Sequence, residues 1–482
     1  MPDELRADAL ACYGNPISRT PHFDQLAREG TLFANCHAQF PVCGASRCSM
    51  LTGWPAHVRG HRSLYYFLRP DEPNLFRYLR RAGYEVLWFG KNDALAPASF
   101  ADSVSEWRDR SPPLSAETLA AFASGGVIPG ATTMLFDAYG DRRDTGDHAN
   151  LQAAITAIER WESASPFCVF LPLTQPHPPY RAPQGFHDLY DPDDLPPLVP
   201  PGLPGRPGFH AGLRERCRLT DVPERALRQV RAVYLGQVAY VDWMLGELLA
   251  ALERTGRARD TALFVASDHG DYAGDYGLIE KWPSGLEDCL THVPLMARIP
   301  GGARGHRVDE LVELFDLMPT LLALAGTEPT HTHFARSLLP QLHGAAGDAG
   351  RAAFSEGGYD AFEPQAFEPL LRGLYGPKTE LQNHDPGSVS RCASIRTATH
   401  KYVARPGGQS ELYDCQADPG LADNLIGQAG HAAMQAALAE RLLAWHIHTS
   451  AAPPADKDAR ALPPFLRTPS FGAAPADFLD ER

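Results

Sequence analysis

The sequence lacks the patterns that mark disulfide-rich and membrane-spanning proteins. None of its nine cysteines forms a CxxC pair, and their number is odd. Neither a zinc ribbon nor a dense disulfide framework is therefore indicated, so we expect mostly reduced, buried thiols. No apolar run reaches about 18 residues, the length of a membrane-spanning helix. The first residues, MPDELRAD, lack the apolar core of a signal peptide, which predicts a cytoplasmic protein.

The chain also lacks an excess of positive charge. Its 58 Asp and Glu residues outnumber its 44 Lys and Arg residues, and the net charge is −14. This balance argues against a nucleic-acid-binding surface, although a local cationic pocket can still hold an anionic substrate. With 482 residues, of which 44% are hydrophobic, the chain is long enough for two globular domains.

Short apolar runs alternate with helical patterns, which is typical of an α/β sheet with crossover helices. Three of these runs are predicted to be buried strands, at residues 84–90, 167–173 and 261–267. The clearest helix is expected over residues 224–252, where apolar residues recur at helical spacing and Pro223 suits the helix start.

A composition shift near residues 344–350 precedes short strand-like pieces that suit a small antiparallel sheet. We therefore expect a main α/β domain at residues 1–345 and a C-terminal subdomain at residues 346–450. The remaining residues, 451–482, are rich in Ala and Pro and are expected to be a loosely ordered tail.

Polar residues follow each of the three predicted strands at once. Lys91 follows the first strand and His177 the second, while Asp268 and His269 follow the third. Ligands of open α/β sheets bind beyond the carboxyl ends of the strands, so together these residues predict a site that pairs a metal with an anion. Asp268 and His269 suit a divalent cation, and Gly270 allows the backbone to bend there. Asp268 could equally cap the following turn.

The stretch PVCGASRCSMLTG, residues 41–53, places two cysteines, a serine and an arginine at a predicted helix start. Ser46 is expected to be the N-cap, and the free N–H groups beside it favour an anion. Arg47 adds a forked cation. Cys43 could be a thiolate nucleophile, half of a metal site or ordinary packing. Its spacing of five from Cys48 suits neither a redox pair nor a zinc hook.

The segment CGASR, which begins at Cys43, and the LTG that follows it resemble the signature of the type I, formylglycine-dependent sulfatases. Further blocks resemble the same family in the same order: GYEVLWFGK, PHPPY, SDHGDYAGDYGL, EKW, VPLMARIPG and ELYDCQADPGLADNL. The resemblance covers roughly residues 3–445. It implies an alkaline-phosphatase-like α/β fold with a mixed, mostly parallel central sheet flanked by helices. It also implies a smaller C-terminal α+β subdomain with a short antiparallel sheet.

The resemblance implies a metal-dependent sulfuric ester hydrolase. The family's matching cysteine, here Cys43, is oxidised by a formylglycine-generating enzyme to Cα-formylglycine, which is hydrated to a geminal diol. One diol oxygen attacks sulfur and expels the alcohol, and the second hydroxyl then eliminates sulfate. Arg47 is implied to hold the diol, and Lys91 and Lys281 to bind the sulfate oxygens. His177 is implied to bind sulfate or to protonate the leaving alcohol.

The metal ligands that the resemblance implies, usually for Ca²⁺, are Asp3, Glu4, Asp268 and His269. His269 stands where the family often has asparagine, which makes Mn²⁺ or Mg²⁺ an alternative. Glu4 stands where aspartate is commoner. Ala45 replaces the proline of the best-known signature, which points to a different maturing enzyme. Asp93 stands where a histidine is thought to act as the base for sulfate elimination, so that role is open.

The leading hypothesis is a sulfatase that acts on small or oligosaccharide sulfate esters, with no nucleic acid or membrane as partner. One alternative is a phosphonate monoester or phosphodiester hydrolase of the same superfamily, because both substrates are tetrahedral monoanions. The other is a non-catalytic binding protein on this scaffold, against which the full set of cationic and nucleophilic residues argues.

The metal ligands at the beginning of the chain raise a further expectation. In the family the first two ligands end an apolar strand, whereas only Met1 and Pro2 precede Asp3. We therefore expect the natural chain to carry about six to ten further residues, the length of a strand. Such a segment could include a signal peptide, which leaves the localisation open.

Overall fold

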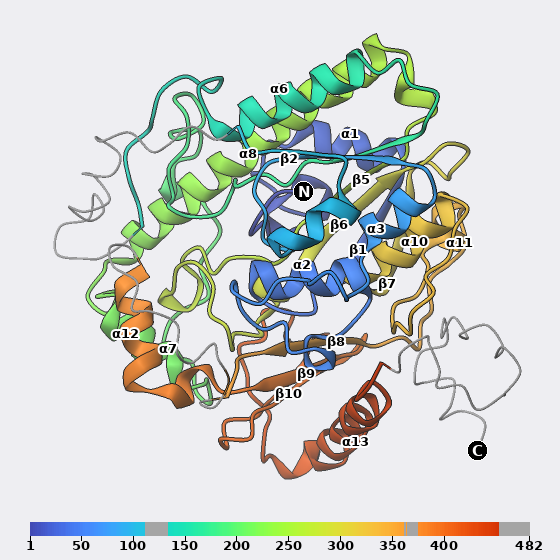
Figure 1. Ribbon diagram of the computed structural model, residues 1–482. Helices are drawn as coiled ribbons and strands as arrows, with labels where there is room; N and C mark the ends of the chain where they lie inside the picture. The colour runs from blue at the N-terminus through green and yellow to red at the C-terminus, as the bar shows by residue number, and fades with distance from the viewer. Residues whose placement is uncertain (111–133, 361–362, 364–374, 453–482) are drawn as a thin grey trace, which may run out of the picture.

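The computed structural model describes residues 1–110, 134–360, 363 and 375–452 of the chain (Figure 1). Its strands are β1 (Thr31–His37), β2 (Glu85–Phe89), β3 (Glu106–Arg108), β4 (Phe167–Phe170), β5 (Leu263–Ala266), β6 (His292–Arg298), β7 (His306–Glu313), β8 (Ala353–Gly357), β9 (Cys392–Arg396), β10 (His400–Ala404) and β11 (Glu411–Asp414). Its longer helices are α1 (Pro21–Glu29), α2 (Cys43–Thr52), α3 (Leu75–Arg81), α6 (Gly146–Glu159), α7 (Phe209–Arg216), α8 (Glu224–Arg254), α10 (Leu317–Leu324), α12 (Gly376–His384) and α13 (Ala432–His448). The one-turn helices are α4 (Phe100–Ser103), α9 (Asp288–Thr291) and α11 (Leu339–Leu342).

Two strand groups form the centre of the main domain. One has the order β3-β2-β4, with parallel pairs, and the other has the order β5-β6-β1-β7. In the second group β1 pairs with β7 in parallel, and β6 pairs antiparallel with both β1 and β5. The predicted mixed sheet flanked by helices is therefore confirmed, and all three predicted strands are present as β2, β4 and β5.

The first five residues lie between the two strand groups. Beside the chain that follows β4, the Leu173 N–H donates to the Met1 carbonyl at 2.8 Å and the Asp3 N–H to the Gln175 carbonyl at 3.2 Å. Beside the end of β5, the Leu5 N–H donates to Ser267 Oγ at 2.8 Å. This short segment thus connects the two groups and holds Asp3 at their common edge.

Helices cover both faces of the sheet, and β2 shows why its sequence is a continuous apolar run. Val86 and Trp88 pack in the core beside α3 and α10, whereas Leu87 and Phe89 pack with Ala154 of α6. A strand that is buried on both faces needs no polar alternation. Figure 1 shows α6, α8 and α1 on one side of the sheet and α2, α3 and α10 on the other.

The predicted long helix is confirmed as α8, which begins after Pro223 and extends to Arg254. Its apolar residues face the larger core, where Val230, Val233 and Val238 are fully buried. Burial of these side chains, rather than helix propensity, provides most of the stability of such a helix. Among the described helices, none is long and apolar enough to cross a membrane. All nine cysteines are free thiols, as expected.

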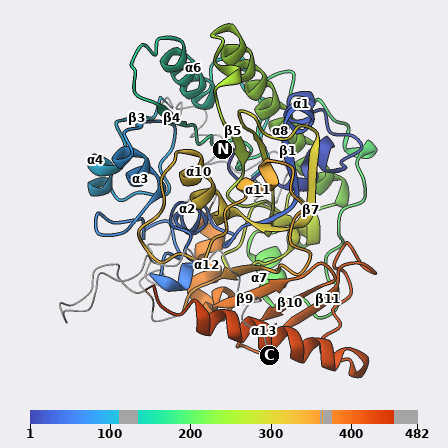
Figure 2. The same cartoon turned by 90° about the vertical axis from the view of Figure 1, so that its right-hand side faces the viewer.

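The C-terminal subdomain is an antiparallel sheet in the order β11-β10-β9-β8, covered by α13 (Figure 2). The Trp445 indole of α13 stacks on Phe354 of β8, with ring centroids 4.7 Å apart. The Glu356 N–H donates to the Gln39 carbonyl at 2.8 Å, which joins β8 to the main domain. The predicted small antiparallel sheet is thus present. The predicted tail lies outside the described residues from position 453 onward.

Candidate active site

Three strand ends and one helix bring most of the predicted residues into one buried cluster. β2, β4 and β5 are followed by the loops of Lys91, His177 and Asp268, respectively. Helix α2 begins at Cys43, and Ser46 Oγ in its first turn donates to the Asp268 carbonyl at 2.6 Å. The carboxyl ends of the strands and the beginning of α2 therefore meet at one site, as expected for an open α/β sheet.

The Cys43 side chain lies at the centre of the cluster and is 2% exposed. Its Sγ is 3.2 Å from His269 Nε2 and 3.5 Å from Asp3 Oδ1. Burial, and then the negative charge of Asp3, raise the pKa of the thiol well above its ordinary value. The unmodified thiol is therefore protonated at neutral pH, and a plain thiolate nucleophile is disfavoured.

Arg47 connects two carboxylates beneath Cys43. Its Nε donates to Asp268 Oδ2 at 2.8 Å and a terminal nitrogen donates to Asp3 Oδ2 at 3.1 Å. The whole side chain is buried, and its other terminal nitrogen has no hydrogen-bond partner among the described residues. Burial alone would raise the pKa of Asp3, but the charges of Lys91 and Arg47 outweigh it and hold the pKa well below its ordinary value. Asp3 is therefore ionised.

One local expectation, the Ser46 N-cap, was wrong. Val42, in extended conformation, is the N-cap residue of α2, and no side chain caps the helix. Because the helix begins four residues earlier than predicted, Ser46 lies inside it and its hydroxyl bonds to the Asp268 carbonyl. The backbone at Gly270 is not left-handed; a Cβ at this position would lie 2.0 Å from the Cys289 carbonyl oxygen. Glycine is required there for close approach of two chain segments.

Three of the four predicted metal ligands, together with Cys43, form one group of possible donors. The ligand atoms of Asp3, Cys43, Asp268 and His269 lie within 4.8 Å of one another. His269 Nδ1 is 2.8 Å from the Gly270 carbonyl, so Nδ1 donates and the lone pair of Nε2 faces the group. Two carboxylates and a correctly oriented imidazole fit a divalent cation of the Ca²⁺, Mn²⁺ or Mg²⁺ class.

Glu4, the fourth predicted ligand, belongs to a neighbouring group with Asp3 and His177. Its backbone is left-handed, with φ +68°, and directs the N–H at Asp268 Oδ1, 3.1 Å away. The Glu4 carboxylate instead accepts from Lys281 Nζ at 2.9 Å. Burial raises the pKa of Glu4 to about 8, although Lys281 opposes the rise. The structure therefore places Glu4 beside Asp3 but outside the group that contains Asp268 and His269.

His177 and Lys281 form the second wall of the site. His177 Nδ1 lies 2.6 Å from the Pro178 carbonyl, which can only accept, so Nδ1 carries the proton. His177 Nε2 then accepts from Lys281 Nζ at 2.9 Å. Burial lowers the pKa of His177 well below its ordinary value, and Lys281 lowers it further. His177 is therefore neutral, and the proton between the two side chains belongs to the Lys281 ammonium.

Lys91 adjoins the cluster through Asp3. Its Nζ makes ion pairs with Asp3 and, at 2.7 Å, with Asp93. Burial disfavours the charged ammonium, but the negative charges nearby, first that of Asp3, outweigh it and raise the pKa of Lys91. Two permanently charged lysines thus flank Cys43, an arrangement that suits a tetrahedral oxyanion. The Asp93 carboxylate thus shares the Lys91 ammonium with Asp3.

Sequence reasoning missed several residues that shape the site. Asp147, in the first turn of α6, accepts from the Thr174 N–H at 2.8 Å and so holds the loop of His177. Burial raises the pKa of Tyr375 to about 12, and the smaller effects of Lys281 and Cys43 show that its phenol lies in the field of the site. No motif marks either residue, because each lies far along the chain from the groups it faces.

Glu356 of β8 also lies near α2 but outside the cluster. It accepts from Arg62 at 2.7 Å and pairs with His57 Nδ1 at 2.9 Å. His57 Nε2 lies 3.0 Å from the Thr449 carbonyl, so both of its ring nitrogens have partners. These residues connect the subdomain to the main domain, and we assign them a structural role.

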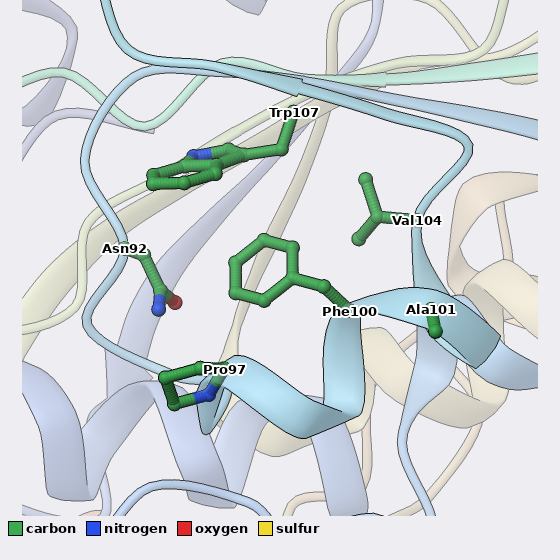
Figure 3. A pocket seen from close by; sticks show the side chains of 6 residues that line it. All are labelled: Asn92, Pro97, Phe100, Ala101, Val104 and Trp107. Atoms are coloured by element: carbon green, nitrogen blue, oxygen red, sulfur yellow. The ribbon is translucent and has the colours of Figure 1, made fainter.

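A separate apolar pocket of about 350 Å³ lies beside the loop of Lys91. It is lined by Asn92, Pro97, Phe100, Ala101, Val104 and Trp107. Figure 3 shows the rings of Phe100 and Trp107 and the amide of Asn92 around it. The Asn92 Nδ2 donates to the Leu95 carbonyl at 2.7 Å and thus serves its own loop. The pocket includes no charged side chain and therefore cannot hold the anionic group of a substrate.

The family model described as Sulfatase matches residues 1–327. Iduronate 2-sulfatase of Homo sapiens is 29% identical over 376 residues, which cover 68% of this chain and 68% of that protein. The multifunctional alkaline phosphatase superfamily protein PehA of Trinickia caryophylli is 26% identical over 502 residues, which cover 93% of this chain and 92% of that protein. A solved phosphonate monoester hydrolase from Silicibacter pomeroyi is 27% identical, with a TM-score of 0.74 over 93% of this chain and 94% of that chain.

Proposed function

Because the chain belongs to the sulfatase family and is a sulfuric ester hydrolase, we propose that it cleaves sulfate esters with a formylglycine at position 43 and a divalent cation. The observation that supports this most directly is the surroundings of Cys43. The residue is buried between Lys91 and Lys281, with an electroneutral, protonated thiol. The hydrated aldehyde would place two hydroxyl groups where the weak nucleophile now lies.

The reaction then follows from the groups at the site. One diol oxygen loses its proton and attacks sulfur, the bond from sulfur to the ester oxygen breaks, and the alcohol leaves with a proton. The second diol hydroxyl loses its proton, the carbonyl double bond reforms, and the bond from carbon to the sulfate oxygen breaks. Water restores the diol. A diol is needed because the second hydroxyl, once deprotonated, provides the electron pair that forms the carbonyl and expels sulfate.

The lysines and His177 have distinct tasks in this scheme. Lys91 and Lys281 bind the oxygens on which negative charge develops, and this preorganised stabilisation is a large part of catalysis. The Lys281 ammonium donates to Glu4, His177 and Glu280, and in this scheme it turns the N–H that faces His177 toward the leaving alcohol. His177 fixes the direction of the Lys281 ammonium. Asp93, paired with Lys91, is a candidate base for sulfate elimination.

The Asp3, Asp268 and His269 side chains would hold the cation. When bound, a divalent cation lowers the pKa of a hydroxyl in its shell and offsets the charge of the substrate. Arg47 lies between Asp3 and Asp268 and offsets the repulsion between them, which prepares the oxygen donors. Glu4 lies on the side of Lys281 and is a candidate ligand only if its carboxylate turns.

A second candidate function is hydrolysis of phosphonate monoesters or phosphodiesters. It is favoured by the similarity to the Silicibacter pomeroyi phosphonate monoester hydrolase, which is 27% identical and covers 93% of the chain, as PehA also does. The full-length relatives thus include the C-terminal subdomain. Comparison of kcat/KM for an aryl sulfate, an aryl phosphonate monoester and a diaryl phosphate will decide which ester is preferred.

The test of the mechanism is detection of the aldehyde at position 43. The protein is coexpressed with a formylglycine-generating enzyme, labelled with a hydrazide and digested, and the peptide with residues 41–53 is identified by mass. We expect the label on that peptide and aryl sulfate turnover in proportion to it. Full turnover by protein with an intact Cys43 thiol would refute the formylglycine mechanism.

A further inference from the structure

The backbone directly before Lys281 has an unusual conformation. Glu280 has a left-handed backbone, with φ +60°, which is costly for a residue other than glycine. Its N–H donates to the Tyr180 hydroxyl at 2.7 Å, and its carbonyl accepts from the Tyr272 N–H at 3.0 Å. Such strain persists only where the surroundings impose it, and it fixes the direction in which Lys281 leaves the backbone.

The Glu280 carboxylate lies between two lysines. Its Oε1 accepts from Lys281 Nζ at 2.9 Å, and its Oε2 accepts from Lys378 Nζ. Lys378 also donates to the Lys281 carbonyl, and its ammonium lies 5.9 Å from the centre of the Trp282 ring. The three charged side chains are 8%, 4% and 9% exposed for Lys281, Glu280 and Lys378, respectively.

The charges of this triad explain why Lys378 is needed. Lys281 donates to two carboxylates, those of Glu4 and Glu280, and Lys378 adds a second ammonium beside Glu280. Lys281 thereby keeps positive charge for a substrate anion while Glu280 holds it in place. Without Lys378 the pair would be neutral, and the unshared Glu280 carboxylate would draw the Lys281 ammonium toward itself. In a buried site this change is weakly screened by solvent. Lys378 belongs to α12, so this residue comes from beyond the main domain.

We propose that Lys378 and Glu280 are a positioning pair for the reaction, through which the first turn of α12 sets the direction and the available charge of Lys281. This inference depends on the proposed role of Lys281 at the oxyanion. Neither residue needs to touch the substrate. Tyr375, three residues before Lys378, lies in the field of the same ammonium. Tyr375 and Lys378 of the C-terminal subdomain thus take part in catalysis through their effect on Lys281.

The test compares Lys378→Met with the double variant Glu280→Gln/Lys378→Met. We expect Lys378→Met to lower kcat for an aryl sulfate by about tenfold to a hundredfold, a typical effect of a misplaced catalytic group. The inhibition constant of inorganic sulfate is expected to rise by a similar factor. The double variant, which removes both charges, is expected to recover most of both losses, because a neutral glutamine amide in place of the carboxylate no longer competes for Lys281.

Lys401→Met is the matched control. Lys401 is also buried and donates to Asp288 Oδ1 at 2.6 Å, but it lies in β10, away from the cluster. We expect this variant to lose thermal stability and to keep the wild-type kcat and sulfate inhibition. Wild-type sulfate inhibition in Lys378→Met, or a double variant no better than the single one, would overturn the inference while leaving the sulfatase function intact.

The failure of the proposed function gives a different result. If the wild type cleaves aryl phosphonates and not aryl sulfates, the sulfate-ester proposal is wrong. The same three variants are then compared with an aryl phosphonate as substrate and inorganic phosphate as inhibitor. Loss in Lys378→Met and recovery in the double variant would still support the positioning pair, and equal constants in all variants would refute it.

Discussion

Replacement of Arg47 by Met offers a direct test of how the cation site is built. Methionine keeps the apolar stem of the side chain, but the variant leaves Asp3 and Asp268 buried without the guanidinium that now binds both. Removal of one partner of a buried ion pair costs about 3–5 kcal/mol, and Lys91 still neutralises Asp3, so we expect about 3 kcal/mol. A divalent cation between the same carboxylates replaces the lost positive charge. The variant is therefore expected to recover stability when metal is added.

The assay is urea unfolding of wild type and Arg47→Met, followed by circular dichroism, in EDTA and in excess Ca²⁺ or Mn²⁺. The metal is expected to shift the midpoint further in the variant than in the wild type, because it relieves a greater repulsion. Arg307→Met is the control, since Arg307 is half-exposed and pairs with the exposed Asp309. Exposed pairs contribute about 1 kcal/mol or less. An equal loss for Arg47→Met in EDTA and in metal would refute the reasoning.

Three further predictions test the nucleophile, the oxyanion lysine and the subdomain contact. Cys43→Ala is expected to abolish turnover with the fold intact, and Cys43→Ser to accumulate a sulfate ester that mass spectrometry detects. Cys48→Ala is expected to keep full activity. Steady turnover by either Cys43 variant would contradict the mechanism. Lys91→Ala is expected to lower kcat by about a hundredfold to a thousandfold with a smaller change in KM, measured with an aryl sulfate. Burial alone would raise the pKa of Glu356, but Arg62 and His57 outweigh burial and lower the pKa from 4.5 to about 2. The ionised carboxylate therefore stabilises the fold above about pH 4.5, and this stability is lost as the pH falls toward 2. Glu356→Gln should flatten that part of the curve of unfolding free energy against pH, and an unchanged slope would refute the assignment.

The sequence could predict those elements whose residues form a recognisable pattern along the chain. The run around β2 is apolar because both faces are covered, and α8 repeats its apolar residues at helical spacing. Strand ends then indicate Lys91, His177 and Asp268 without any alignment. The beginning of α2 was misplaced, because Val42 starts the helix without a capping side chain and so leaves no local signal.

The parts that the sequence could not predict depend on contacts between distant residues. The protonation of His177 is set by Pro178 and Lys281, and the orientation of Glu4 by a left-handed backbone, neither of which appears in a motif. The motif EKW marked Lys281, but Lys378 lies about a hundred residues further along the chain and outside any matched block.

The burial of α2 has a consequence for the order of events during biosynthesis. All ten residues of this helix are buried, and Cys43 is in contact with Asp3 and His269, which come from distant parts of the main domain. An oxidising enzyme needs the thiol in its own active site, which the finished fold forbids. In the proposed formylglycine mechanism, conversion of Cys43 would therefore have to precede closure of the domain, while the chain is still being synthesised. The yield of active protein would then depend on the rate of modification relative to the rate of folding. Slower synthesis should therefore raise the specific activity without changing the amount of folded protein.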